Sequence, residues 1–204
     1  MNTENCLFVG LALLISLIIY PITVRLACRY SVFDRPNQRK LQQNPVPVLG
    51  GIPIAFGMVV PMLIAAVCGW SDGMYQLIIA IVVLNLIGTI DDVRDIPAWI
   101  RFVLEMLVIW VLIWRPNQPD NGFMIDCLNG LWGRQDISVY TALPLTIFAG
   151  VGIVNAINMI DGVDGYSSGY GMITCALFAM IFSYLGMGQQ ALISSISVAA
   201  CVPF

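Results

Sequence analysis

The sequence predicts an all-α protein, a polytopic bundle of about seven transmembrane helices with the N-terminus outside. Three observations support this prediction. Of 204 residues, 59% are hydrophobic and only 10% are charged, whereas a soluble globular domain carries about 25% charged residues. The apolar residues gather in runs of the length that crosses a bilayer, about 17–25 residues. The basic residues gather between alternate runs, as the positive-inside rule describes.

Each apolar run is a predicted span. The runs are Cys6–Val24, Ile52–Trp70, Met74–Ile90, Ala98–Trp114, Val139–Ile157, Ser167–Gly186 and Gln190–Phe204. They are too long and too uniformly apolar for barrel strands, so helices are the expected way across the lipid. The last run is short for a span and apolar to its end, so we expect the chain to end inside its seventh helix.

The basic residues set the expected orientation. No Lys or Arg precedes the first run, which argues against a signal peptide. Alternating crossings place seven basic residues on one side: Arg25, Arg29, Arg35, Arg39, Lys40, Arg94 and Arg101. Only Arg115 and Arg134 fall on the other side. Because short loops rich in Lys and Arg stay in the cytoplasm, the basic loops are expected inside.

Composition also narrows the function. A net charge of −3 with scattered basic residues gives no reason to expect nucleic-acid binding. The chain has no histidine, so any metal is expected to be a hard cation bound by oxygen, unless thiols are recruited. The six cysteines form no Cys-x-x-Cys pair and are expected to be packing residues. Asn-Gly pairs at 121–122 and 129–130 favour turns in the outer segment.

Two acidic clusters lie at the expected cytoplasmic ends of spans. Asp91 and Asp92 end the third span, and Asp161 and Asp164 follow the fifth. The helix dipole disfavours negative charge at a C-terminus, so a sequence that repeats this arrangement is expected to gain a function from it. Asp91 and Asp92 could equally mark the membrane boundary. The glycines beside Asp161 and Asp164 make that alternative weaker there, because they let oxygens approach one centre.

The oxygen-bearing groups near these acids suit Mg²⁺, with Mn²⁺ as the alternative. Asn155 and Asn158 precede the second acidic cluster. Mg²⁺ usually binds one or two carboxylates and shares its other positions with water and phosphate. The basic loop that contains Arg39 and Lys40 therefore indicates a phosphorylated substrate, although topology and attraction to anionic lipids explain those charges as well.

Two further features have both a functional and a structural explanation. Gly50 and Gly51 stand at the head of the second span, where exposed backbone N–H groups could bind phosphate, but such a pair alone is a weak signal. Arg101 could bind a phosphate, or it could pair with Glu105 one helical turn later.

Together these motifs resemble the polyprenyl-phosphate N-acetylhexosamine-1-phosphate transferases of the MraY/WecA type. The matching segments are Asp34–Lys40 with Pro45–Gly51, Gly88–Asp92 and Asn155–Gly165, in the family's order and on the same side. The first loop is closer to the WecA branch, which uses UDP-GlcNAc or a related UDP-sugar. Leu41 and Gln42 stand where the family commonly has a histidine. The family's later Gly-Asp and His-rich motifs are absent, so 1–204 is expected to be a single transmembrane transferase domain without its C-terminal part, and inactive by itself.

The resemblance implies an enzyme that transfers GlcNAc-1-phosphate from UDP-GlcNAc to undecaprenyl or another polyprenyl phosphate. Transfer would depend on Mg²⁺, release UMP and initiate cell-envelope glycan synthesis, including that of lipopolysaccharide. The implied location is the bacterial inner membrane with the active face in the cytoplasm, and a homodimer is left open.

The resemblance also assigns roles to residues. Asp91 is implied as the base or orienter of the lipid phosphate, and Asp92 as a residue that positions substrate or metal. Asn158 and Asp161 are implied as metal ligands. The remaining assignments are Asp164 in the nucleotide-sugar site, Lys40 and Arg101 on phosphates, and Arg39, Gly50, Gly51 and Asn155 in substrate binding.

Three rival functions remain open. An ion-coupled transporter also carries acids in its spans, but these should lie near the bilayer midplane in broken helices. A non-catalytic membrane remnant would explain the missing motifs. A CDP-alcohol phosphotransferase is disfavoured, because its Asp-Gly-x-x-Ala-Arg signature is absent.

Overall fold

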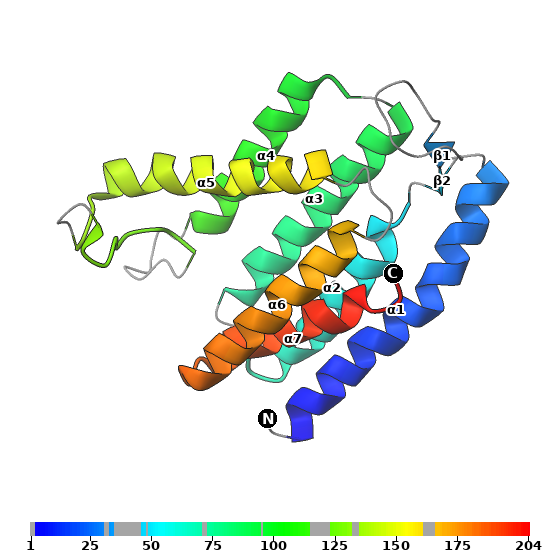
Figure 1. The fold of residues 1–204 in the computed structure, drawn as a ribbon, viewed down its shortest axis with the longest axis horizontal. Helices are drawn as coiled ribbons and strands as arrows, with labels where there is room; N and C mark the ends of the chain where they lie inside the picture. Colours follow the sequence, from blue (N-terminus) through cyan, green and yellow to red (C-terminus); the bar gives the residue numbers. More distant parts are fainter. Residues whose placement is uncertain are drawn as a thin grey trace. The chain divides into compact units, whose positions relative to one another are not determined.

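The structure is a computed structural model that describes residues 3–30, 33–34, 46–47, 49–70, 73–94, 96–114, 123–131, 135–160 and 166–204. Within these ranges the chain forms seven helices (Figure 1). They are α1 (Thr3–Tyr30), α2 (Gly51–Val67), α3 (Met74–Arg94), α4 (Ala98–Ile113), α5 (Val139–Ile160), α6 (Tyr166–Tyr184) and α7 (Gly188–Cys201). Every predicted span is a helix, which confirms the predicted helical fold.

Among the residues that the structure describes, four helical segments are long and apolar enough to cross a membrane: Asn5–Tyr30, Met74–Arg94, Val139–Met159 and Ser167–Tyr184. The helices α2, α4 and α7 are shorter, with 17, 16 and 14 residues. Large apolar side chains point outward from the long helices; Leu7 on α1 is 72% exposed and Phe148 on α5 is 78% exposed. Such surfaces suit lipid as the solvent, as expected for a membrane protein. The number of spans and the side of the N-terminus stay predictions.

The chain divides into two compact units. Unit 1 comprises Met1–Asp95 and Ile160–Phe204, and therefore contains α1, α2, α3, α6 and α7. Unit 2 comprises Ile96–Met159 and contains α4 and α5. The assignment of 1–204 to one transferase domain stays a prediction.

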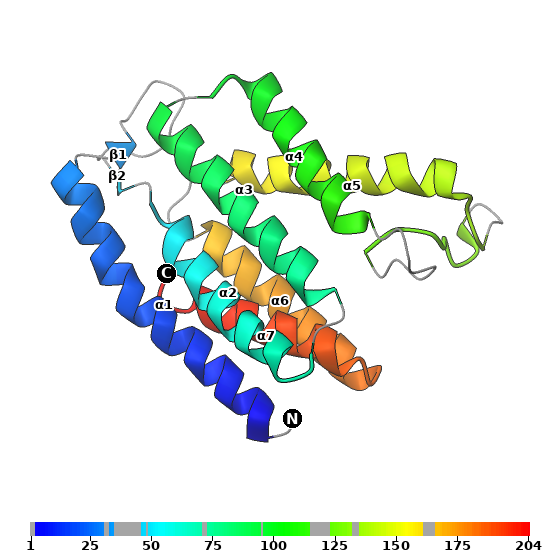
Figure 2. The ribbon, with the colours of Figure 1, turned by 180° about the vertical axis from the view of Figure 1, so that it is seen from behind.

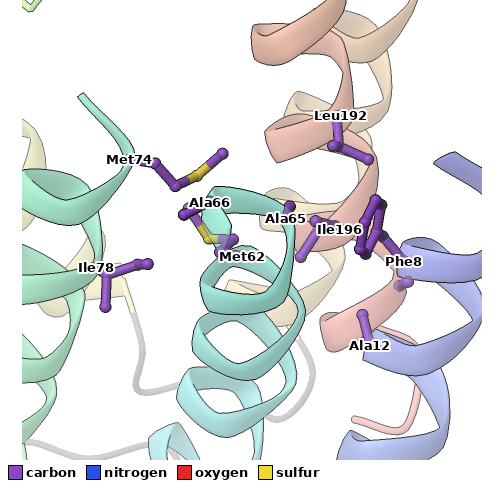
Figure 3. Close-up of a cluster of buried hydrophobic side chains, with 10 residues drawn as sticks. Phe8, Ala12, Met62, Ala65, Ala66, Met74, Ile78, Leu192 and Ile196 are labelled. Atoms are coloured by element: carbon purple, nitrogen blue, oxygen red, sulfur yellow. The ribbon is translucent and has the colours of Figure 1, made fainter. Parts of the chain in front are cut away.

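In unit 1, α2 and α7 form the centre. Helix α1 packs against both of them, α3 packs against α2, and α6 packs against α7 (Figures 1 and 2). Buried side chains from four helices form the core shown in Figure 3. Its members are Phe8, Ala12, Met62, Ala65, Ala66, Met74, Ile78, Leu192, Ile196 and Ala199. The alanines let the helix backbones approach closely, as is common where helices pack in membranes.

Helices α1, α2 and α7 pack closely around Gly57. A Cβ on Gly57 would lie 2.1 Å from Ser16 Oγ and 3.1 Å from the Cβ of Ala200. Ser16 Oγ in turn donates a hydrogen bond to the carbonyl of Pro53, at 3.0 Å. A side chain at position 57 would therefore disturb both a helix contact and a buried hydrogen bond.

Helix α1 is longer than its apolar run predicts. It continues past Val24 to Tyr30, so Arg25 and Arg29 lie on the helix and not in the loop. Pro21 lies inside it without ending it. Just after the proline, Thr23 Oγ1 donates to the Tyr20 carbonyl at 2.8 Å.

Helix α7 extends almost to the last residue of the given chain, and the incompleteness of the seventh span stays a prediction. The helix ends at Cys201, and Phe204 N–H donates to the Cys201 carbonyl at 3.1 Å to close a turn. Pro203 has no N–H with which to continue the helical ladder beyond this point.

Two short strands join the ends of the basic loop, which the sequence did not predict. In β1 (Phe33–Asp34) and β2 (Val46–Pro47), Phe33 pairs with Pro47 and Asp34 with Val46 in antiparallel register. Residues 35–45 connect the strands and lie outside the described residues.

The segment between α4 and α5 contains the predicted Asn-Gly turn. Asn129 and Gly130 both have positive φ, 48° and 83°, as a type I′ turn requires. Leu131 N–H donates to the Leu128 carbonyl across the turn, at 2.9 Å. This prediction is confirmed for residues 129–130, whereas the pair at 121–122 lies outside the described residues.

Candidate active site

The predicted site residues fall in three groups. One group lies outside the described residues: Arg39, Lys40, Asp161 and Asp164. A second belongs to unit 1: Gly50, Gly51, Asp91 and Asp92. The third belongs to unit 2: Arg101, Asn155 and Asn158. The second and third groups are each described within their own unit.

The paired aspartates lie in the last turn of α3, which continues to Arg94. Asp91 is half-buried and Asp92 is exposed. The carbonyls that end an α-helix carry partial negative charge, so two adjacent carboxylates there are electrostatically unfavourable by a few tenths to about 1 kcal/mol each. The predicted placement of this pair at a helix C-terminus is confirmed. A cation or a positively charged group nearby would offset the unfavourable term.

The head of α2 lies alongside this part of α3. A Cβ on Gly51 would lie 2.9 Å from Asn85 Nδ2 on α3. Thr89, one turn further along, donates from Oγ1 to the Asn85 carbonyl at 2.8 Å. Asn85 precedes Asp92 by seven residues, two helical turns or about 10 Å, so the two side chains share one face of α3. The paired glycines and the paired aspartates therefore belong to neighbouring helices at the same end of unit 1.

Gly50 is covered by an aromatic ring. A Cβ on Gly50 would lie 2.7 Å from Cε1 of Phe204, and the Phe204 ring packs edge-on against Tyr20 of α1, with centroids 5.0 Å apart. Gly50 has a right-handed backbone, with φ −61° and ψ −31°, so space and not conformation favours glycine there. Phosphate binding by this pair stays a prediction.

The opposite end of unit 1 contains a cavity of about 260 Å³. Asn5, Trp70 and Gly188 line it, with Ser183 and Ser195. Trp70 immediately precedes the turn into α3, whereas the aspartates lie in the last turn of the same helix. The cavity is therefore separate from the acidic end.

Unit 2 brings three polar side chains together between α4 and α5. Glu105 is only 2% exposed, and its Oε1 lies 3.6 Å from Arg101 Nε on the same helix. Asn155 Nδ2 on α5 donates a hydrogen bond to Glu105 Oε2. The structural alternative for Arg101, an ion pair with Glu105, is thus present. It does not exclude phosphate binding, because a guanidinium has five N–H donors.

Asn158 follows Asn155 by three residues on α5 and is exposed. Residues three apart are neighbours on a helix surface, so Asn158 lies beside Asn155 in the last turns before Asp161. In the ranges that the structure covers, no three acidic or thiol side chains gather as a metal site. The amide oxygen of Asn158 is nevertheless a hard oxygen donor of the kind that Mg²⁺ prefers.

Sequence reasoning left two residues out of the site. The sequence spacing indicates Glu105 only as a partner of Arg101, although a carboxylate inside a predicted span is by itself a signal of function. Asn85 was not considered. It stands in an apolar run of α3, but only its contact with Gly51, 34 positions away in the sequence, reveals its place.

Comparison with known proteins identifies the family. Residues 74–204, more than half of the chain, match the glycosyl transferase family 4. The chain belongs to glycosyl transferase family 4. The matched segment includes Asp91, Asp92, Asn155 and Asn158, so two of the three motifs that carried the resemblance lie inside it, whereas the first-loop motif precedes it.

Named relatives of this family 4 chain share one type of reaction. A probable undecaprenyl-phosphate N-acetylglucosaminyl 1-phosphate transferase from Bacillus subtilis is 28% identical over 188 residues, 92% of this chain and 50% of the relative. A decaprenyl-phosphate N-acetylglucosaminephosphotransferase from Mycobacterium leprae is 30% identical over 174 residues, 78% of this chain and 40% of the relative. The Escherichia coli O157:H7 undecaprenyl-phosphate alpha-N-acetylglucosaminyl 1-phosphate transferase is 27% identical over 181 residues, 88% of this chain and 47% of the relative. The chain thus spans about half the length of these curated relatives.

Proposed function

We propose that this protein transfers GlcNAc-1-phosphate from UDP-GlcNAc to a polyprenyl phosphate and releases UMP. A lipid phosphate oxygen attacks the sugar-linked phosphorus of UDP-GlcNAc. The bond between the two phosphates breaks, UMP leaves with the bridging oxygen, and a new diphosphate joins lipid and sugar. The relatives named for this reaction on undecaprenyl and decaprenyl phosphate support the proposal.

The observation that carries the proposal is the pair Asp91 and Asp92 in the last turn of α3. The family match includes this pair, and two adjacent carboxylates at a helix C-terminus are electrostatically unfavourable, which favours a functional reason for their presence. Helix α3 is continuous from Met74 to Arg94, with its acids at the end. An ion-coupled transporter would instead place its acids in a broken helix near the midplane.

Phosphoryl transfer depends mainly on positioning and on neutralisation of charge. We assign Asp91 as the base or orienter of the lipid phosphate and Asp92 as a residue that positions substrate or metal. Arg101 and Lys40 would bind phosphate oxygens. The remaining substrate contacts would come from Arg39, Gly50, Gly51, Asn155 and Asp164.

Mg²⁺, with Mn²⁺ as the alternative, is the proposed cofactor, held by Asn158 and Asp161. Asn158 offers an exposed amide oxygen, and a carboxylate would complete a donor set that this cation prefers. When bound, the cation would neutralise negative charge on the diphosphate. Removal with EDTA should abolish transfer, and Mg²⁺ should restore it.

The proposed location is the bacterial inner membrane, with the acidic end of unit 1 toward the cytoplasm. The basic residues of the flanking segments support this orientation. UDP-sugars are cytoplasmic substrates, so the site would face its donor. A homodimer is compatible with the proposal, and the transfer reaction itself does not require one.

The proposal is tested with membranes from cells that express the native gene for this chain. The membranes are supplied with Mg²⁺, polyprenyl phosphate and either UDP-GlcNAc, UDP-GalNAc or UDP-glucose. Release of UMP and formation of a lipid-linked sugar should be fastest with UDP-GlcNAc. Faster transfer from UDP-GalNAc would show that the preferred sugar is GalNAc and would leave the proposed type of reaction unchanged. Absence of a lipid-linked product with all three donors would reject the proposal.

A further inference from the structure

Glu105 is a buried carboxylate whose two oxygens have different partners. Oε2 accepts a hydrogen bond from Asn155 Nδ2 on α5. Oε1 lies 3.6 Å from Nε of Arg101, one turn earlier on α4. The side chain of Glu105 is only 3% exposed. One carboxylate therefore joins two residues that the proposed function places in substrate binding.

The partners of Asn155 fix which way its amide points. Besides Glu105, its Nδ2 donates to the carbonyl of Val151, at 3.0 Å. A carboxylate and a carbonyl only accept hydrogen bonds, so only the amide nitrogen can face both. That nitrogen has two hydrogens, and these two bonds use both. The amide oxygen is then the atom with which Asn155 can meet a ligand.

An acceptor oxygen limits what Asn155 can bind. Besides binding a hard cation, it would accept a hydrogen bond from a hydroxyl or an N–H group, and it would repel a phosphate oxygen. The sugar and the uracil of a UDP-sugar both carry such donors. Asn155 is therefore suited to bind a hydroxyl or N–H group of the sugar nucleotide. The phosphates must be bound by other residues.

Helix packing alone does not explain Glu105. One turn later, side-chain atoms of Ile109 lie within 3.2 Å of the Cβ position of Gly150, so α4 and α5 already pack through an apolar contact. Burial of a charged pair is often no more stabilising than apolar residues of similar volume. An ionisable residue within a membrane segment is more often retained for function.

We propose that Glu105 is a positioning residue that holds the Asn155 amide with its oxygen toward a hydroxyl or N–H donor of the sugar nucleotide. This proposal rests on the proposed function and adds to it the chemical class of group that Asn155 binds. Glu105 itself need not touch the substrate.

The kinetic test compares Glu105→Gln with Ile109→Val in the protein expressed from its native gene. Glutamine keeps the shape of Glu105, but one of its two terminal atoms is a donor, so it cannot accept from both partners. We expect Glu105→Gln to lower kcat/KM for UDP-GlcNAc by about 10- to 100-fold, chiefly through KM. Ile109→Val loosens the same pair of helices and should stay within about twofold of wild type. Equal losses in the two variants would reduce Glu105 to a packing residue and overturn the proposal.

A second test measures the contact between Glu105 and Asn155 through protein stability, without an activity assay. Asn155→Asp places two carboxylates face to face and should lower the melting temperature of the purified protein in detergent. In the double variant with Glu105→Gln, the glutamine amide can donate a hydrogen bond to the new carboxylate at position 155. The double variant should therefore recover most of the lost melting temperature. Additive losses would overturn the proposal even in an active enzyme. If the double variant recovers its melting temperature but the native protein turns over no UDP-sugar, the proposed function is rejected, whereas the contact between Glu105 and Asn155 is supported.

Discussion

Gly51 at the head of α2 lies against the side-chain amide of Asn85 on α3, so that a Cβ on Gly51 would stand 2.9 Å from Asn85 Nδ2. This contact joins the helix that begins with the paired glycines to the helix that ends with the paired aspartates. Gly51 lies inside α2, where any L-residue fits the backbone. Space for Asn85, and not conformation, therefore favours glycine.

The contact predicts a coupled effect of two substitutions. Gly51→Ala should lower the free energy of unfolding by about 1 kcal/mol, because the new Cβ displaces the end of the Asn85 side chain. In an Asn85→Ala background the same change should be neutral or stabilising by up to about 1 kcal/mol, since alanine favours a helix over glycine. Melting temperatures of the four proteins in detergent measure the coupling, and an equal loss in both backgrounds would show that the contact is absent.

Gly57 should tolerate alanine less well than other helical glycines. Its Cβ would meet Ser16 Oγ at 2.1 Å and the Ala12 carbonyl oxygen at 3.2 Å, and a backbone atom cannot rotate away. We expect Gly57→Ala to destabilise the protein by about 1–3 kcal/mol. Gly10 on α1 is the matched control, because its Cβ would meet nothing within 4 Å. If Gly57→Ala and Gly10→Ala proteins melted at the same temperature, the three helices would not pack as described.

The orientation can be measured with two exposed cysteines. Cys127 lies in the segment between α4 and α5, which is expected outside, and Cys28 lies near the end of α1, which is expected inside. In variants that keep one cysteine each, a membrane-impermeant maleimide should label Cys127 in intact cells, and Cys28 only after permeabilisation. Cys201 is buried and should resist labelling in both conditions. The reverse labelling pattern for Cys28 and Cys127 would show that the topology is opposite to the predicted one.

The helices could be predicted from the sequence because each apolar run carries its own signal. Their ends were less predictable. The apolar run stops at Val24, but α1 continues to Tyr30, because arginine, as at positions 25 and 29, is a good helix former even where the sequence is no longer apolar. The pairing of β1 with β2 involves two residues on each side, too few to leave a pattern in the sequence.

The candidate site was predictable where its residues are close in the sequence. Asp91 and Asp92 are adjacent, and their place at a helix end follows from the run before them. The bond between Glu105 and Asn155 joins positions 50 residues apart. It depends on which faces of α4 and α5 meet, and local pattern does not specify that.

The central claim is Asp91-dependent transfer of GlcNAc-1-phosphate to a polyprenyl lipid. The most direct measurement is formation of the lipid-linked product from UDP-GlcNAc by membranes of cells that express the native gene, either as wild type or with Asp91→Asn or Asp126→Asn. Asp126 is an exposed acid in the segment between α4 and α5 and serves as the control. The account predicts product with wild type and Asp126→Asn, and a rate at least about 100-fold lower with Asp91→Asn, as expected for loss of a general base. A rate for Asp91→Asn equal to that of Asp126→Asn, at matched amounts of folded protein, would contradict it.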